Sequence, residues 1–246
     1  MINFAQILLI MISKPSFLRN IPPVTLNLLI INVLFFIANE CFSSDLNHFL
    51  GLHFIKSSFF YPFQFISYMF MHGNLTHLFF NMFGLFMFGR ILEHFWGGKK
   101  FLLFYFIAGI GAGLIQEIVW YIDLYEIISN PLITQISINP EMPEEFITRE
   151  KLFSMFITVG ASGSLFGILF AFGFMFPQEK IMLVFLPIPI PARIFVVLYA
   201  IAELFLGVAN FNWDNIAHFA HLGGALFGLI MIFWWRKKGK LFNRQI

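Results

Sequence analysis

Ser162 lies in the segment GASGSLFG (160–167), within a chain that is 59% hydrophobic. A serine hydroxyl becomes a useful nucleophile only when a neighbouring base takes its proton. The segment AHFAHLGGALFG (217–228) offers two candidate bases, His218 and His221. These residue types indicate acyl-transfer chemistry, although a serine among glycines is also typical of two membrane helices in close contact.

Both segments carry two glycines four residues apart: Gly163 with Gly167, and Gly224 with Gly228. Such pairs let two helices approach closely within a membrane. We interpret them as packing faces that bring Ser162 within reach of His221, so the structural and chemical interpretations agree. The absence of side chains at Gly160 and Gly163 also leaves room for a substrate carbonyl beside the serine. Free N–H groups at a helix start favour the negative charge that develops on that carbonyl.

The segment MHGNLTHLFFNMFG (71–84) adds two further polar side chains. His77 and Asn81 are four residues apart and therefore lie on one face of a helix. Each can donate a hydrogen bond, as a site for an oxyanion requires. His72 precedes His77 by five residues and is interpreted as an interfacial or loop-bracing histidine.

A zinc site is the competing interpretation of the histidines, namely His72, His77, His218 and His221. The His-x4-His spacing and the absence of a nearby carboxylate or cysteine in the sequence make this interpretation weak. We therefore expect no metal and no cofactor.

The composition indicates an integral membrane protein. Charged residues make up only 11% of the chain, against roughly a quarter in a soluble domain, and the mean hydropathy is +0.81. The net charge of +2, with no basic cluster among aromatics, argues against nucleic-acid binding. Cys41 is the single cysteine, so an internal disulfide is excluded, and we interpret it as a packing residue.

Six segments are predicted to cross the bilayer as helices, since each supplies close to the roughly 20 apolar residues that a crossing requires. They are residues 24–42, 74–92, 100–121, 159–176, 191–210 and 215–235. The predicted fold class is thus an all-α membrane bundle. Residues 24–235 form one domain with a polar outer insertion at about 122–158, preceded by a terminal segment (1–23) and followed by a basic tail (236–246). The apolar start of the chain lacks the basic residue and cleavage site of a signal peptide.

The distribution of Lys and Arg predicts the orientation. If the N-terminus is cytoplasmic, that side collects twelve of the 15 basic residues, and only Lys56, Arg149 and Lys151 lie outside. Both termini are then cytoplasmic. This topology places Ser162 just below the outer surface, His77 and Asn81 in the outer half of the second span, and His221 about 9 Å deep. Polar groups from three spans therefore share one depth.

Taken together, these residues resemble the rhomboid family of intramembrane serine proteases. The signatures are His77-x3-Asn81 in the second span, Gly160-Ala161-Ser162-Gly163 at the start of the fourth, and Ala220-His221-Leu222-Gly223-Gly224-x3-Gly228 in the sixth. Any one of them is weak, but all three in order on a six-span chain are specific. The resemblance covers approximately residues 20–235 and implies a six-helix bundle with a membrane-embedded first outer loop.

The resemblance also implies the role of each residue. Ser162 would be the nucleophile and His221, rather than His218, the general base. His77, Asn81 and the backbone N–H of Ser162 would form the oxyanion hole. Other residues match family positions that support the site. Phe166 would pack on the imidazole, His72 would brace the loop above the site, and Glu93 would be structural. The matching glycines are Gly160, Gly163, Gly224 and Gly228.

The first outer loop departs from the family pattern. Members often carry Trp-Arg there, whereas this chain has Phe63-Gln64. The loop, at about 44–72, is therefore expected to be held differently, with the chemistry unaffected.

We expect a Ser–His dyad with no carboxylate partner. Asp214 is about two turns from His221, and Glu117 lies on a span without motifs. Glu203, buried at comparable depth in the fifth span, is the serious candidate for a third member. We expect it to be neutral or bonded to a neighbouring helix, because an isolated charge in hydrocarbon is costly.

The predicted function is a protease that cleaves transmembrane proteins in or near the bilayer. The resemblance implies substrates whose helices are weakened by Gly, Ala, Ser or Pro. A catalytically silent relative that binds membrane helices is the alternative, but such relatives lose the serine or the histidine. A transporter or channel would show ionisable groups across the bilayer or inverted repeats. The lack of a long extramembrane domain favours a minimal bacterial-type enzyme in the inner membrane.

Overall fold

The structure is a computed structural model that describes residues 21–41, 45–130, 132–137, 146–183, 186–209 and 217–241. It is an all-α membrane bundle, which confirms the predicted fold class. Five helical segments of the described chain are long and apolar enough to cross a membrane: Pro23–Cys41 (α2), Leu75–Trp96, Gly98–Asp123 (α7), Ala192–Ala209 (α11) and His218–Lys237 (α12). The second consists of α5 (Leu75–Gly84), a π-helical turn η3 (Leu85–Gly89) and α6 (Arg90–Trp96).

The predicted fourth span is shorter than expected. Helix α10 covers Ser162–Met175, 14 residues, so at 1.5 Å per residue it is only about 21 Å long. It begins three residues after the start of the predicted span over 159–176 and ends one residue before the end of that span. Gly160 has a φ of 130°, which interrupts helical geometry just before Ser162. A short helix is tolerated at membrane depth because α10 is surrounded by protein rather than by lipid.

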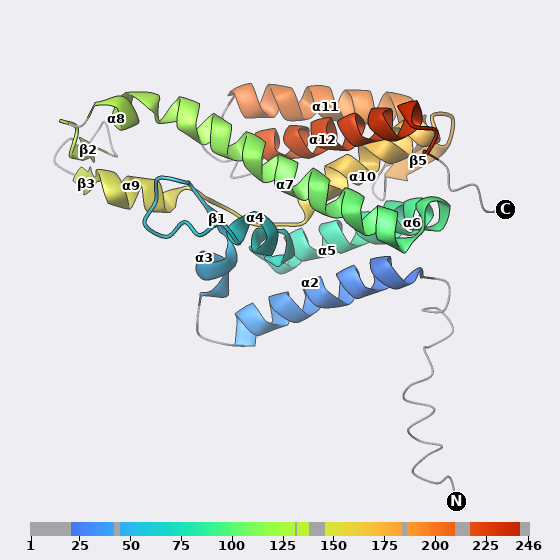
Figure 1. Cartoon of the computed structure of the whole chain (residues 1–246), viewed down its shortest axis with the longest axis horizontal. Helices are drawn as coiled ribbons and strands as arrows, with labels where there is room; N and C mark the ends of the chain where they lie inside the picture. Colours follow the sequence, from blue (N-terminus) through green and yellow to red (C-terminus); the bar gives the residue numbers. More distant parts are fainter. Residues whose placement is uncertain are drawn as a thin grey trace, which may run out of the picture.

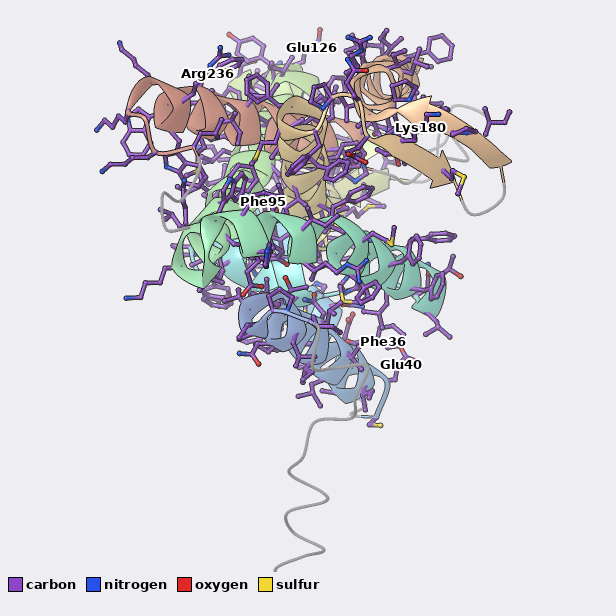
Figure 2. The ribbon with its side chains drawn as sticks, turned by 90° about the vertical axis from the view of Figure 1, so that its right-hand side faces the viewer. Phe36, Glu40, Phe95, Glu126, Lys180 and Arg236 are labelled. Carbon is purple, nitrogen blue, oxygen red and sulfur yellow. The ribbon has the colours of Figure 1, made fainter. Side chains whose placement is uncertain are left out.

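Helices α7, α10 and α12 pack together in the middle of the bundle, with α2 and α11 at opposite edges (Figure 1). Most of the residues of α10 are buried, whereas α11 buries only Ala192, Val196 and Glu203. The end of the bundle that faces the viewer in Figure 2 carries the labelled Phe95, Lys180 and Arg236, from α6, β5 (Lys180–Leu183) and α12. β5 pairs there with β6 (Leu186–Pro191) in an antiparallel hairpin.

Glycines set the distance between α10 and α12, as the paired spacing predicted. A Cβ added at Gly224 would collide with the backbone carbonyl of Gly163. One turn further along, a Cβ at Gly228 would lie 2.9 Å from Cα of Gly167, which is also too close. The two backbones therefore touch at these positions, and α10 and α12 cannot carry side chains there.

Glu93 joins the C-terminal end of the second span to the start of α2. Its carboxylate accepts hydrogen bonds from the backbone N–H of Val24 and of Thr25, at 2.9 and 2.6 Å. The hydroxyl of Thr25 donates a third, at 2.7 Å. A helix start leaves N–H groups without intrahelical partners, and a carboxylate satisfies them well. The contacts are those of a structural residue, as the family resemblance implied.

The first loop contains α3 (Leu46–Leu50), β1 (Leu52–His53), α4 (Gln64–Ser67) and the 3-10 turn η2 (Tyr68–Phe70). Gln64 is fully buried within it. Its amide nitrogen donates to the carbonyls of Phe49 and Phe59, at 3.1 and 2.9 Å. Its amide oxygen accepts from the N–H groups of His53 and Tyr61, at 3.3 and 3.2 Å. This neutral side chain thus ties four backbone groups of the loop together.

The polar insertion lies at the other end of the bundle from the β5–β6 hairpin (Figure 1). It contains α8 (Tyr125–Ser129), β2 (Gln135–Ser137), β3 (Phe146–Thr148), α9 (Arg149–Met155) and β4 (Ile157–Thr158). β2 pairs with β3, and β4 pairs with β1 of the first loop, both antiparallel. Phe54, Trp120 and Phe153 form a small buried cluster between the loop, α7 and α9. The insertion is therefore packed against the first loop directly before Ser162.

Candidate active site

Ser162 is the first residue of α10 and is held there by the chain on its N-terminal side. Gly160, two residues earlier, donates a backbone hydrogen bond of 2.9 Å to the carbonyl of Tyr68 in η2. The first hydrogen bond of the helix runs from Leu165 N–H to Ala161 O, so the N–H of Ser162 precedes the intrahelical ladder. The positive end of the helix therefore lies beside the hydroxyl.

His221 faces Ser162 across the glycine contact between α10 and α12. Its Nε2 is 2.8 Å from the Oγ of Ser162, which is hydrogen-bond distance. The serine can donate its proton to Nε2 when that nitrogen is unprotonated. The arrangement is that of a hydroxyl next to a general base, and the two residues are 59 positions apart in the chain.

The ring of Phe166 stacks on the imidazole of His221. Its ring lies 4.2 Å from the ring of His221, with an angle of 6° between the two planes. Phe166 is one turn after Ser162 on the same helix, so α10 supplies both the nucleophile and the platform of its base. Tyr199 of α11 also packs against Phe166, at 4.9 Å between ring centroids.

His77 borders the same space as Ser162. A Cβ added at Gly160 would lie 2.7 Å from Nε2 of His77 and 3.5 Å from Oγ of Ser162. The absence of a side chain at Gly160 thus leaves a small gap between the two polar atoms. Helix α5 begins directly before His77 because the side chain of Asn74 accepts a hydrogen bond from His77 N–H, at 2.8 Å.

Asn81 lies one turn after His77 on α5 and is buried. Its amide nitrogen has no hydrogen-bond partner among the described residues. A buried donor of this kind is costly unless a ligand or a transition state uses it. Asn81 therefore has the property expected of an oxyanion donor.

His72 is buried within the protein, with only 1% of its surface exposed. Its ring meets the ring of His77 edge-on at 5.0 Å, and its backbone carbonyl accepts a hydrogen bond from Asn47. Burial, together with the charge on a protonated His77, lowers the pKa of His72 to about 3. A neutral His72 thus packs behind His77 and is anchored to the first loop.

The expectation that no carboxylate lies within reach of His221 is wrong. Oε2 of Glu203 is 3.0 Å from Nδ1 of His221, and the same oxygen is 2.6 Å from Nδ1 of His218. The carboxylate comes from α11 and is 4% exposed. The expected hydrogen bond from Glu203 to a neighbouring helix does exist, but its partners are the two candidate bases themselves. The signal in the sequence was an acidic residue inside an otherwise apolar span.

The structure also separates the two histidines, which spacing alone could not do. His221 presents Nε2 to Ser162, whereas His218 lies one turn nearer the start of α12 and bonds to Glu203. The four histidines of the zinc interpretation do not meet as one set. His72 pairs with His77, while Glu203, His218 and His221 form a separate group whose ligand atoms lie within 4.8 Å of one another.

The Glu203 group has the donor types of a zinc site but not its spacing. Three ligands at 2.0–2.1 Å from a tetrahedral zinc would be separated by about 3.3 Å. The separations of 2.6 and 3.0 Å from Glu203 to the histidines instead match charge-assisted hydrogen bonds. Within the described residues, these three side chains are the only cluster with the donor set for a metal.

The sequence of this chain is similar to those of proteins from one known family. Residues 60–238 match the model of the rhomboid domain. The chain is 30% identical over 176 residues to "Rhomboid protein 1, mitochondrial" of Saccharomyces cerevisiae, covering 72% of this chain and 42% of that protein. It is 32% identical over 165 residues to "Rhomboid protease AarA" of Providencia stuartii, covering 66% and 52% of the two chains.

A third similar protein is "Rhomboid-like protein 11, chloroplastic" of Arabidopsis thaliana, which is 26% identical over 198 residues. That match covers 76% of this chain and 59% of the relative. The chain thus spans between about two fifths and three fifths of the length of these relatives. All three matches carry the same family word in their names.

Proposed function

Because the chain belongs to the rhomboid family, we propose that it is an intramembrane serine endopeptidase that cleaves transmembrane-helix substrates in or near the bilayer. The observation that carries this proposal is the 2.8 Å contact between Oγ of Ser162 and Nε2 of His221. A catalytically silent relative would have no need of a nucleophile and a base in contact. The name of the Providencia relative, a rhomboid protease, agrees with the proposal.

In the proposed reaction, Oγ of Ser162 attacks the carbonyl carbon of the scissile peptide bond. The hydroxyl proton passes to Nε2 of His221 as the new C–O bond forms. The tetrahedral intermediate then collapses, and the C–N bond breaks as His221 returns the proton to the leaving amine. Water, deprotonated by the same nitrogen, then attacks the carbonyl carbon of the acyl-enzyme ester. The C–O bond to Ser162 breaks, the proton on Nε2 returns to Oγ of Ser162, and the second product leaves as a carboxylic acid.

The oxyanion would be stabilised by donors from two helices. Gly160 has no side chain, so a substrate carbonyl could enter the gap between His77 and Ser162. The amide of Asn81 and the N–H of Ser162 complete the proposed set of donors, together with Nε2–H of His77. Such preorganised donors act mainly on the charge that develops in the transition state.

The resemblance to the family suggests substrates with helices weakened by Gly, Ala, Ser or Pro and a small residue before the scissile bond. The physical reason is that backbone in a stable helix is hydrogen-bonded and cannot extend into a serine active site. The partners of the protein would then be transmembrane substrates and the lipid bilayer.

The protein is an integral membrane protein, and we place both termini in the cytoplasm. The support is the bias of Lys and Arg, with Lys180 and Arg236 at the end of the bundle nearest the viewer in Figure 2. Ser162 would then lie near the outer surface. The expected bacterial inner membrane stays a prediction, because relatives include a mitochondrial and a chloroplastic protein.

The decisive experiment uses the purified full chain in proteoliposomes with a panel of tagged transmembrane substrates. Wild type should release two fragments from at least one substrate, and Ser162→Ala should release none. A fluorophosphonate probe, which reacts covalently with activated serines, should label wild type but not Ser162→Ala. A wild-type protein that is folded, yet neither cleaves any substrate nor reacts with the probe, would overturn the proposal in favour of a silent helix-binding relative.

A further inference from the structure

Glu203 is a buried acid on α11, a helix most of whose side chains are partly or fully exposed. Its neighbours Ile201, Leu204 and Phe205 are exposed by 59%, 51% and 64%, whereas Glu203 is exposed by only 4%. An ionisable side chain at membrane depth is expensive unless it has partners. The rotation of α11 turns this one side chain toward α12, away from lipid.

One oxygen of Glu203 contacts two imidazoles. Oε2 lies 2.6 Å from Nδ1 of His218 and 3.0 Å from Nδ1 of His221, both within charge-assisted hydrogen-bond range. An ionised carboxylate can only accept hydrogen bonds. Each imidazole must therefore carry its proton on Nδ1 to make both contacts. Two donors on one buried oxygen also offset the cost of keeping the charge away from water.

The proton on Nδ1 decides what the other nitrogen of His221 can do. A neutral imidazole has one N–H and one lone pair, so a proton on Nδ1 leaves the lone pair on Nε2. Nε2 is the atom that faces Ser162 at 2.8 Å. The opposite tautomer would present an N–H to the serine and could not accept its proton. The carboxylate is therefore placed to select the one tautomer in which His221 is a base.

We propose that Glu203 is a positioning residue of the reaction, which holds His221 in its basic tautomer and balances the imidazolium that forms during attack. The inference rests on the proposed protease function. When the proton of Ser162 moves to Nε2, His221 becomes a cation with N–H groups at both positions. Glu203 stays ionised throughout and takes no proton, so the buried group passes from one net negative charge to neutral.

His218 has a distinct part in this arrangement. Its hydrogen bond to Oε2 is the shorter of the two and comes from one turn earlier on α12. It satisfies the carboxylate continuously, including while His221 changes charge. His218 therefore anchors Glu203, and Glu203 orients His221. The catalytic unit then comprises Ser162 and His221, which touch the reacting atoms, and two residues that act through them.

The first test is made on the wild-type protein, and variants serve only to assign the signals. Wild-type protein labelled with 15N-histidine is examined by NMR above the pH at which the imidazoles become neutral, where long-range 1H–15N correlations distinguish the two tautomers. His221 and His218, assigned by comparison with His221→Gln and His218→Gln, should both carry the proton on Nδ1. Neutral His221 with its proton on Nε2 would overturn the proposal, whether or not the protein cleaves any substrate.

The second test compares Glu203→Gln with Glu117→Gln in the same proteoliposomes. Glu117 is a matched control, since it is also a buried carboxylate of a membrane span and bonds to a backbone N–H, that of Ile55, but does not contact the site. Glu203→Gln should lower kcat by about 10²–10⁴-fold with little change in KM, because an amide can donate to Nδ1 and favour the wrong tautomer. Glu117→Gln should leave both constants close to wild type.

Two further variants, Glu203→Asp and His218→Gln, distinguish a role of Glu203 in positioning His221 from a role in fold stability alone. Glu203→Asp keeps the charge and should recover kcat by about tenfold over Glu203→Gln. His218→Gln removes one of the two donors and should lower kcat by about tenfold. Folding is checked by thermal unfolding of each variant. If folded Glu203→Gln keeps a kcat near wild type, or if KM rises while kcat does not fall, the proposal is wrong.

These outcomes are distinct from a failure of the proposed function. If wild type neither cleaves substrates nor reacts with the fluorophosphonate probe, the protease assignment fails, while the tautomer measurement still decides the role of Glu203. If wild type cleaves and the Glu203 variants behave like Glu117→Gln, the protease assignment stands and Glu203 is only structural.

Discussion

The ring of Phe166 lies flat against the ring of His221, with 4.2 Å between their centroids and 6° between their planes. The hydrogen bonds of His221 to Ser162 and Glu203 constrain the imidazole within its own plane, and Phe166 prevents it from tilting out of that plane. Three contacts on three sides thus define the position of one side chain.

Replacing Phe166 with leucine should therefore lower kcat by about two- to tenfold, as expected for the loss of one aromatic stack. KM should change little, because Phe166 acts through the base. Phe172→Leu is the control, since Phe172 is also buried on α10 but packs against Phe88 and Phe176 instead of the site. Steady-state cleavage in proteoliposomes measures both. Equal losses in the two variants would mean that the effect comes from packing of α10 in general.

Ser162→Ala and His221→Ala should each abolish cleavage without unfolding the protein. Because a nucleophile and its base act as one unit, the double variant should be no slower than either single variant. The rates are compared in a long-incubation assay sensitive to residual turnover. Substantial cleavage by Ser162→Ala, with the protein pure, would remove the serine mechanism.

Asn81→Ala should slow cleavage more than it weakens substrate binding, since an oxyanion donor acts mainly in the transition state. Removal of one donor typically costs about 10²–10³ in rate, and the remaining donors could reduce that loss. The unpartnered amide nitrogen of Asn81 is the structural reason for this expectation. A variant with unchanged kcat and raised KM would contradict the assignment of Asn81 to the oxyanion hole.

Gly224→Ala should destabilise the bundle and reduce activity together, because the new Cβ would collide with the carbonyl of Gly163. Overpacking of this kind typically costs about 1–3 kcal/mol. The control is Gly84→Ala, where a Cβ would meet only Leu165 at an ordinary 3.7 Å. Thermal unfolding and cleavage are measured for both variants. An unfolding temperature of Gly224→Ala equal to that of Gly84→Ala would show that α10 and α12 can separate at no cost.

Chelators should leave cleavage unchanged. The separations within the Glu203, His218 and His221 group match hydrogen bonds better than zinc ligands, so the mechanism uses protons there. Activity is measured after dialysis against EDTA, with and without added zinc. Activity lost in EDTA and restored by zinc would instead assign the group to a metal.

The sequence alone determined the class of the protein, and it predicted the membrane helices and the residues proposed for the chemistry. Apolar runs and the bias of basic residues are local features of the sequence. The hydrocarbon core of the bilayer selects apolar runs as membrane helices, and the basic residues next to those helices set their orientation. The short motifs around His77, Ser162 and His221 were also visible, because each is contiguous in the chain. The paired glycines predicted the close contact of α10 with α12, since small-residue spacing is a local signal.

Only the tertiary structure decided which side chains meet. Glu203 and His221 are 18 positions apart on different helices, and their contact depends on how α11 is rotated against α12, which hydropathy does not encode. For the same reason the sequence alone does not predict this contact, although Glu203 is identifiable as an acid inside an apolar span. The bracing of the first loop by Gln64 was also decided by the fold, because it depends on where distant carbonyls and N–H groups lie. The start of α10 at Ser162 was decided by the backbone turn at Gly160.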